Sequence, residues 1–375
     1  MFNVYQPWDP LKVCVVGHSY DPEFYRFIKN KKARFAMEKI ARETEEDYQK
    51  LISLLEEFGV EVLRPNIIDN YTDALVLDKI IKPPMNPRDY SIMIGKNFYL
   101  SCNYYDSLKG ADWPDLRPTT ISNLENLPEN IKKEIISTIN VEHLHLPNTY
   151  SDIQSKIPNI IFNHLDKGVQ VNGAMITRIG KDLYFGTENH GGDLTLTSLK
   201  KIYSKMFPDY RCHVINTGGH SDGCFCPVVP GLIVSLNNIQ TYEDTFPGWE
   251  VVYLPNQSWN KVKPFMDLKK KNKGKWWVPG EELNDDFTSF VEEWLGHWVG
   301  YVEETVFDVN MLVIDEKNVV CNNYHEEVFK AFDRHGIKPH VVNFRHRYFW
   351  DGGLHCITSD VHREGVMKDY FPERG

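Results

Sequence analysis

The sequence repeats one pattern: a short apolar run reaches a turn that contains glycine or aspartate, and a second apolar run follows. Four full copies span residues 89–102, 172–186, 222–236 and 308–322, and a shorter copy begins at residues 11–17. Repeated units of this size bury a common core only by packing against one another. The pattern therefore predicts a closed array in which the first strands of successive units converge on one central pocket.

Segments with a helical period separate the paired strands from a third, strand-like run. The helical segments cover residues 34–58, 107–140 (in part), 194–207, 240–246 and 325–335, and the strand-like runs cover residues 60–65, 141–147, 210–215, 249–255 and 339–344. Each unit is therefore expected to contain strand, strand, helix and strand. This order predicts an α/β fold of repeated ββαβ units in a single domain of residues 1–375, and an ordinary α/β sheet with hairpin-paired strands is the alternative.

The composition excludes several classes of protein. Hydrophobic residues make up 42% of the 375 residues and aromatic residues 13%, which argues against disorder. The net charge of −10 argues against a nucleic-acid partner, and no apolar run is long enough to span a membrane. Residues 1–12 lack the pattern of a signal or transit peptide, and the seven cysteines are an odd number. We therefore expect a cytoplasmic protein with reduced thiols, and whether it forms a homodimer stays open.

Polar side chains stand where the first strands of successive units begin. They are Asp89, Asn172, His220 and Asp222. His220 and Asp222 follow two glycines and are two positions apart, so in a strand they would face the same way. An imidazole beside a carboxylate suits proton transfer next to a bound cation, and a carboxylate at position 89 suits a planar guanidinium. The plainer interpretations are a loop histidine, solvated or capping aspartates, and an Asn-Gly turn at Asn172.

A cysteine, Cys356, follows the last unit. Gly352 and Gly353 precede it and allow a ligand to approach the thiol closely, and the thiolate is the reactive form of cysteine. His355 is the next residue in sequence and is expected to point away from the thiol. An inert, buried cysteine is the alternative interpretation.

Metal and phosphate sites are not predicted. Cys224 with Cys226, and His143 with His145, alternate within apolar runs. Neither pair has a second pair of ligands at the spacing that zinc sites require. The sequence also lacks a glycine-rich phosphate loop and a nucleophile elbow.

Three segments of the sequence resemble the arginine:glycine amidinotransferase family. They are residues 7–17 (PWDPLKVCVVG), residues 310–317 (NMLVIDEK) and residues 352–365 (GGLHCITSDVHREG). The family resemblance also extends to the order of three motifs: an aspartate after Pro-Arg, a His-x-Asp after two glycines, and a late Gly-Gly-x-His-Cys. The resemblance covers most of the chain. It implies the guanidino-group-modifying pentein fold, a five-bladed ββαβ propeller with a central active-site pocket.

The resemblance also implies a ping-pong reaction. Cys356 is expected to attack the guanidinium carbon of L-arginine and release ornithine, and an acceptor amine then takes the amidino group. His220 is expected to protonate the leaving amine and to deprotonate the acceptor, while Asp89 and Asp222 hold the cation. The partners are therefore small molecules, a guanidine donor and an amine acceptor, and neither a metal nor an organic cofactor is expected.

The sequence departs from the family pattern in two places. The carboxylate partner of the family's catalytic histidine aligns with Asn172, whose amide orients an imidazole or donates to substrate but cannot stabilise an imidazolium by charge. The arginine and two serines that grip glycine's carboxylate align with Ile239, Glu303 and Glu304. A hydrolase or deiminase of the same superfamily is therefore an alternative, and a non-catalytic propeller that serves as a binding module is a third.

We predict that glycine is a poor acceptor compared with simple diamines and amino alcohols. Two unit charges ~4 Å apart interact by roughly 4 kcal/mol at an effective dielectric of ~20, so Glu303 and Glu304 in the pocket would repel a carboxylate strongly. Steady-state kcat/KM with each acceptor checks this, with arginine and agmatine compared as donors. A higher kcat/KM for glycine would mean that the two glutamates do not face the substrate.

Overall fold

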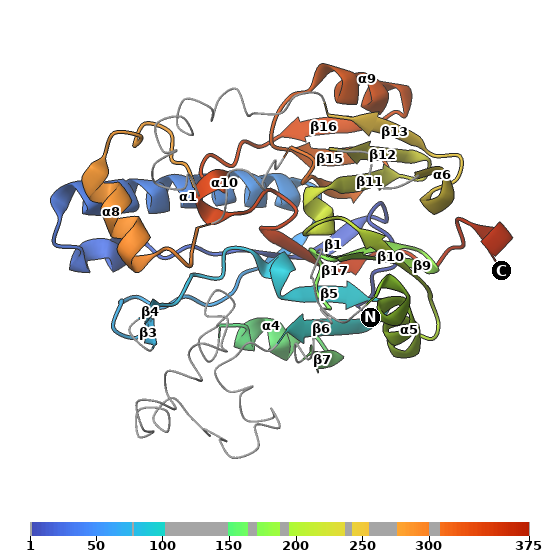
Figure 1. Ribbon diagram of the computed structural model, residues 1–375, viewed down its shortest axis with the longest axis horizontal. Helices are drawn as coiled ribbons and strands as arrows, with labels where there is room; N and C mark the ends of the chain where they lie inside the picture. Colours follow the sequence, from blue (N-terminus) through green and yellow to red (C-terminus); the bar gives the residue numbers. More distant parts are fainter. Residues whose placement is uncertain are drawn as a thin grey trace, which may run out of the picture.

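The computed structural model describes residues 2–76, 79–101, 149–163, 171–187, 195–236, 242–254, 276–299 and 308–374. Within these residues the strands form five three-stranded sheets and one two-stranded sheet. Figure 1 shows the sheets grouped about a common centre, with helices on their outer sides. The small two-stranded sheet, β3 (Leu75–Val76) with β4 (Lys79–Ile80), lies at the periphery.

Four of the three-stranded sheets are built in the same way. In each, two consecutive strands pair antiparallel and the third strand joins the second in parallel. The strands are β5 (Ser91–Ile94), β6 (Asn97–Ser101) and β7 (Ile160–Asn163); β8 (Ile176–Ile179), β9 (Asp182–Thr187) and β10 (Arg211–Asn216); β11 (Phe225–Val229), β12 (Leu232–Ser235) and β13 (Glu250–Tyr253); β14 (Leu312–Asp315), β15 (Asn318–Cys321) and β16 (Lys338–Val341).

A helix precedes the third strand of each of these sheets. These helices are α4 (Ser151–Lys156), α5 (Leu196–Met206), α6 (Tyr242–Thr245) and α9 (Glu326–Arg334). Parallel strands need a crossover connection, and a helix supplies it. The predicted order of strand, strand, helix and strand is therefore confirmed.

The remaining sheet joins the two ends of the chain. β1 (Leu11–Val16) pairs in parallel with β2 (Glu61–Leu63) and antiparallel with β17 (Thr358–Arg363). The short copy of the repeat near the N-terminus is thus an incomplete blade, and the C-terminal segment supplies its missing strand. This pairing closes the ring and fixes residue 356, which lies two positions before β17.

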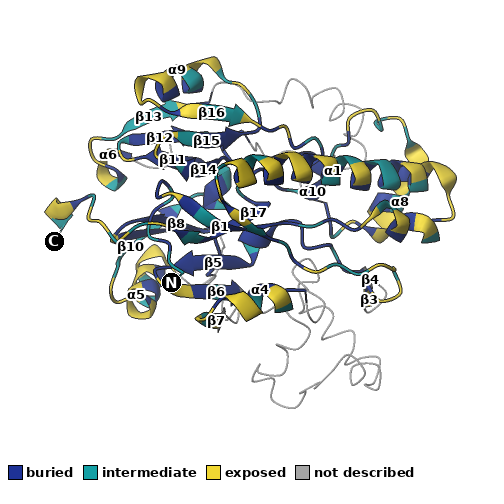
Figure 2. Cartoon of the chain, turned by 180° about the vertical axis from the view of Figure 1, so that it is seen from behind, coloured by how far each residue is buried: buried dark blue, intermediate teal, exposed yellow. Residues whose placement is uncertain are grey.

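The longest helix, α1 (Lys31–Glu57), crosses between β1 and β2. Asn30 caps its N-terminus by accepting hydrogen bonds from the N–H groups of Lys32 and Ala33, and Gly59 follows its end at φ 72°. Its apolar residues recur at helical spacing and face the core, while its other face is exposed (Figure 2). α8 (Asp285–Trp294) packs against α1.

One prediction about the second unit was wrong. The third strand was expected at residues 141–147, which lie outside the described residues. The strand that pairs with β6 is β7, which begins at Ile160, and the helix before it is α4. Both runs are short, apolar and preceded by a helical pattern, and only the pairing with β6 distinguishes them.

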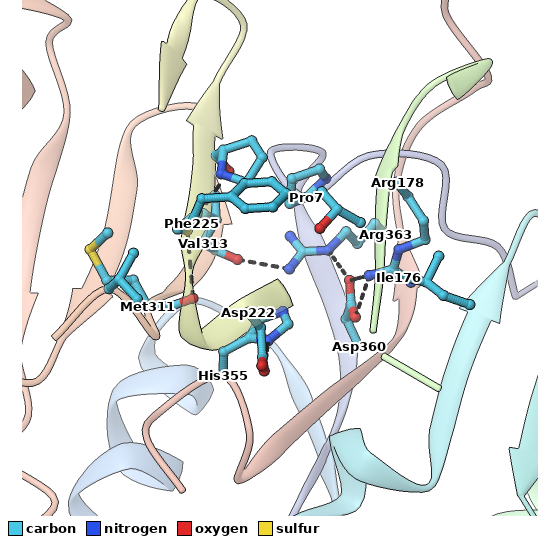
Figure 3. Close-up of a pocket in the computed structure, with 14 residues that line it drawn as sticks. Pro7, Ile176, Arg178, Asp222, Phe225, Met311, Val313, His355, Asp360 and Arg363 are labelled. Atoms are coloured by element: carbon cyan, nitrogen blue, oxygen red, sulfur yellow. Dashed lines mark hydrogen bonds and ion pairs between the residues drawn. The ribbon is translucent and has the colours of Figure 1, made fainter. Parts of the chain in front are cut away.

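The centre of the ring contains a buried ion cluster. The Asp360 carboxylate accepts from Nη1 of Arg88 at 2.6 Å, from Nη2 of Arg178 at 2.7 Å and from Nε of Arg363 at 2.6 Å. The inner strands β8, β11, β14 and β17 surround a cavity of about 40 Å³ beside this cluster (Figure 3). These ion pairs connect β17 to β8 and to the segment before β5, which belong to other sheets and are not joined to β17 by sheet hydrogen bonds.

We predict that Asp360→Asn lowers the free energy of unfolding by about 3–5 kcal/mol, because it leaves buried arginines without their counter-charge. Burial alone would raise the pKa of Asp360, but Arg178, Arg88 and Arg363 outweigh burial and hold the pKa well below its usual value. The stabilisation is therefore present above the unfolded-state pKa of about 4 and is lost as the pH falls through the lower folded-state pKa.

Urea unfolding of the wild type and the variant at neutral pH measures the difference. The exposed Asp333→Asn on α9 is the matched control and should change stability little. Equal stabilities of Asp360→Asn and the control would show that the cluster does not stabilise the ring.

Candidate active site

Cys356 lies in the turn between α10 (Arg347–Trp350) and β17, and it is 4% exposed. The side chain of Asn310, which precedes β14, holds this turn. Its Oδ1 accepts from the N–H of His355 at 2.8 Å and of Cys356 at 2.9 Å, and its Nδ2 donates to the Cys356 Sγ at 3.1 Å. Asn310 therefore fixes both the backbone and the sulfur of the cysteine.

Arg88 also holds this turn. It lies in the short 3₁₀ helix η2 (Pro87–Asp89), and its backbone N–H donates to the Cys356 carbonyl at 3.2 Å. Its Nε donates to the Thr358 carbonyl at 2.8 Å. The segment that carries Asp89 is thereby attached to the segment that carries Cys356.

Asp222 lies beside the thiol. Its Oδ2 is 3.4 Å from the Cys356 Sγ and 2.8 Å from Nδ1 of His355, and the whole residue is 6% exposed. Figure 3 shows the side chains of Asp222 and His355 next to each other at one end of the central cavity. The expectation that His355 points away from the site is therefore wrong, because its ring donates to the carboxylate that the thiol also contacts.

Asp89 and His220 form the outer part of the cluster. Oδ1 of Asp89 is 3.9 Å from Nδ1 of His220, whose side chain is 39% exposed. The buried Oδ1 atoms of Asp89 and of Asp222 have no hydrogen-bond partner within the described ranges. Asp89, His220, Asp222 and Cys356 are thus brought together from three separate segments of the chain.

The local structure at His220 and Asp222 differs from the prediction. They do not lie on a strand: His220 caps the short 3₁₀ helix η5 (Ser221–Gly223), which precedes β11. The N–H of Gly223 donates to the His220 carbonyl at 3.2 Å and closes this turn. A tight turn directs neighbouring side chains differently, so Asp222 reaches inward to the thiol while His220 stays partly exposed.

Asn172 is buried in the turn before β8. Its Oδ1 accepts from the N–H of Met175 at 2.9 Å, and the next residue, Gly173, donates its N–H to the Arg88 carbonyl at 2.9 Å. Asn172 therefore lies next to the segment that carries Asp89. The other expected pocket residues, Ile239, Glu303 and Glu304, lie outside the described residues.

The site favours a neutral thiol when no substrate is bound. Burial raises the pKa of Cys356 well above its usual value, and the charges of Asp222 and Asp89 raise it further. Burial also raises the pKa of Asp89 to about 7. For Asp222, burial acts in the same direction, but the hydrogen bond and charge of His355 outweigh it and place the pKa below its usual value.

The arrangement suits a planar cation with several N–H donors. Buried carboxylate oxygens without a hydrogen-bond partner need donors, and a positive charge close to the sulfur favours the thiolate. Within the described ranges, no group of three or more histidine, cysteine, aspartate and glutamate side chains is arranged to hold a metal ion. The described residues also contain no helix that is both long and apolar enough to cross a membrane.

Sequence reasoning overlooked two positioning residues. The sequence indicates Asn310 only as part of a strand segment that resembles the family, and Arg88 only as the residue before Asp89. Both are polar side chains that are at most 1% exposed. A buried amide or guanidinium needs partners, but the sequence does not reveal that those partners belong to the cysteine turn.

The chain is similar in sequence and in fold to known amidinotransferases. No family model matches the chain. The mitochondrial glycine amidinotransferase of Xenopus tropicalis is 22% identical over 407 aligned residues, which cover 98% of this chain and 84% of that protein. The L-arginine:L-lysine amidinotransferase of Pseudomonas savastanoi pv. phaseolicola is 24% identical over 205 residues, which cover 53% of this chain and 46% of that protein.

Two solved structures share the fold over 99% of both chains. One is SxtG, an amidinotransferase from Microseira wollei in the saxitoxin biosynthetic pathway, with a TM-score of 0.59 and 16% identity. The other is the inosamine-phosphate amidinotransferase StrB1 from Streptomyces griseus, with a TM-score of 0.58 and 18% identity. The predicted propeller and the predicted resemblance are therefore confirmed, and the chain is an enzyme related to the amidinotransferases that has their fold.

Proposed function

We propose that the protein transfers the amidino group of L-arginine to an amine through a covalent intermediate on Cys356. The observation that carries this proposal is the pair of buried carboxylate oxygens, Oδ1 of Asp89 and Oδ1 of Asp222, that lack donors among the described residues. A guanidinium presents five N–H donors in one plane and matches such acceptors. Asp222 is also 3.4 Å from the thiol, so a cation that it binds lies close to the sulfur.

The bound cation would activate the nucleophile. Without it, burial and the charges of Asp222 and Asp89 raise the pKa of the Cys356 thiol well above its usual value. A guanidinium neutralises these charges and adds a positive charge near the sulfur, which lowers the pKa of the thiol. The thiolate then forms when the substrate is in place, which limits side reactions of a free thiolate.

The protons balance without an external acid. The thiolate attacks the guanidinium carbon to form a C–S bond, and the C–N bond to the departing amine breaks once that nitrogen takes a proton. The thiol supplies one proton and the leaving amine requires one, and we assign their transfer to His220, which is partly exposed beside Asp89. In the second half-reaction the acceptor amine loses a proton, attacks the same carbon, and releases the thiolate.

We predict that Asp222→Asn makes Cys356 more reactive toward iodoacetamide near pH 8 in the absence of substrate. The substitution removes the nearest negative charge and an acceptor for the thiol proton, and both changes lower the pKa of the thiol. Alkylation is followed against pH by mass mapping of the peptide that contains Cys356. The exposed Asp209→Asn is the control, and an unchanged pH profile for Asp222→Asn would contradict the assigned electrostatics.

We predict that Cys356→Ala abolishes turnover while the protein stays folded, because the thiol is the nucleophile of the proposed reaction. The wild type is incubated with labelled arginine, with and without a panel of amines, and its intact mass is measured. An amidino adduct on the wild type and transfer that requires an amine are expected. Product formation from arginine with water alone would instead identify a hydrolase, and a wild type without adduct or turnover would indicate a binding module.

For the Cys356→Ala variant, circular dichroism and thermal unfolding show whether the fold is retained. Activity above a few per cent of the wild type would reject Cys356 as the nucleophile.

A further inference from the structure

His355 precedes the candidate nucleophile in sequence, but its side chain contacts a carboxylate from another part of the chain. Its Nδ1 donates to Oδ2 of Asp222 at 2.8 Å, and the Cys356 Sγ lies 3.4 Å from the same oxygen. The proposed reaction uses Asp222 to hold the cation and His220 to move protons, and it leaves the imidazole of His355 without a role. One carboxylate oxygen thus connects an unused histidine to the thiol.

The backbone of His355 is fixed by hydrogen bonds at both its N–H and its carbonyl. The N–H donates to Oδ1 of Asn310 at 2.8 Å. The carbonyl accepts from the N–H of Thr358 at 3.2 Å and from Nε of Arg88 at 3.4 Å. A side chain on a fixed backbone has few rotamers to choose from, so the imidazole meets Asp222 with little further loss of conformational entropy.

His355 also borders the central cavity. His355 and Asp222 both line this cavity of about 40 Å³, and so does the ion cluster around Asp360 (Figure 3). The side chain of His355 is 23% exposed, and a cavity of this size has room for water beside the ring. A smaller side chain at position 355 would therefore enlarge a cavity that already exists, which makes substitutions at this position suitable as tests.

The contact with His355 gives the two oxygens of Asp222 different surroundings. Oδ2 accepts from the imidazole and lies next to the thiol, whereas Oδ1 is buried and has no hydrogen-bond partner among the described residues. The terminal torsion of an aspartate side chain has a broad range. Without the imidazole, the carboxylate would therefore be free to rotate out of the orientation that leaves Oδ1 open to a ligand.

The same contact keeps the carboxylate charged. Burial raises the pKa of Asp222, and the hydrogen bond from His355 is the largest of the influences that bring it below its usual value. Burial and the charge of Arg88 lower the pKa of His355, so its ring is neutral near pH 7 and donates from Nδ1. A neutral donor thus stabilises a buried anion without adding a charge that would compete with a cationic substrate.

We propose that His355 is a positioning residue that holds Oδ2 of Asp222 and thereby presents Oδ1 to the guanidinium beside the thiol. This inference rests on the proposed transfer reaction and adds a residue to its site. In this role His355 neither touches the substrate nor exchanges a proton, which distinguishes it from His220. The donor matters and the remainder of the ring does not.

Two substitutions separate the donor from the bulk of the ring. His355→Asn places an amide N–H near the position of Nδ1, whereas His355→Leu fills a similar volume without a donor. Formation of the Cys356 adduct is timed by intact mass against arginine concentration. His355→Leu should need about tenfold more arginine or more for the same rate, the loss that one hydrogen bond to a charged group produces. His355→Asn should recover most of this loss.

A second measurement needs no substrate. Protein labelled with ¹³C at the aspartate carboxyl groups is titrated by NMR, and the signal that Asp222→Asn removes belongs to Asp222. In the wild type and in His355→Asn its pKa should stay below the usual value of about 4. In His355→Leu burial should dominate, and the carboxyl group should take up a proton at higher pH.

The other charged and titratable groups around Asp222 are the same in the wild type and in these variants, so they do not produce the difference. At the site and across the cavity they are Arg88, Asp89, Arg178, His220, Cys356, Asp360 and Arg363. Circular dichroism and thermal unfolding check each fold. His355→Ala, whose missing volume joins the cavity, replaces His355→Leu if the latter does not fold.

The outcomes are distinct. A wild type that forms no adduct with any guanidine refutes the proposed function, and the NMR titration then still decides whether His355 holds Asp222. An adduct that forms equally well in the wild type and in His355→Leu overturns the positioning role and leaves the transfer reaction standing. Equal losses in His355→Asn and His355→Leu with an unchanged titration of Asp222 would show that the donor is not what matters, and they would also overturn it.

Discussion

The ion pair between Arg88 and Asp360 is the interaction on which the candidate site depends. It joins η2, which presents Asp89, to β17, which begins two residues after Cys356, at 2.6 Å and with both side chains 1% exposed. The Nε and the backbone N–H of Arg88 donate to carbonyls of the cysteine turn. A buried ion pair is costly to desolvate, and here it fixes the segment that carries Asp89 against the segment that carries Cys356.

Closure of the ring by β17 brings Asp360 to Arg88. β17 is the last strand among the described residues, yet it pairs with the first strand, and this pairing positions the cysteine turn at the centre of the propeller. Asn310 then adds a contact from another blade. The cysteine turn is therefore held by β1, by the Arg88 segment and by Asn310, which come from three parts of the sequence.

The electrostatics of the site are matched to a cationic substrate. Burial and the charges of Asp222 and Asp89 raise the pKa of the Cys356 thiol, so the resting site disfavours the reactive thiolate. The guanidinium of the proposed substrate would reverse this balance by placing a positive charge beside the carboxylates and the sulfur. The same negative charge that suppresses the free thiolate would thus select the substrate.

The repeat of paired strands, the helices between them and the glycine-flanked cysteine were readable in the sequence because they depend on local periodicity and backbone freedom. The repeat pattern also predicted a cluster of polar side chains, because equivalent positions of successive repeats meet at one centre. The cluster contains Asp89, His220, Asp222 and Cys356. The sequence did not predict the direction of each side chain, because a short 3₁₀ turn replaces the expected strand at His220 and Asp222. Only the tertiary structure pairs β1 with β17, and it alone gives buried polar groups such as Asn310 their partners, since both depend on contacts between residues far apart in the chain.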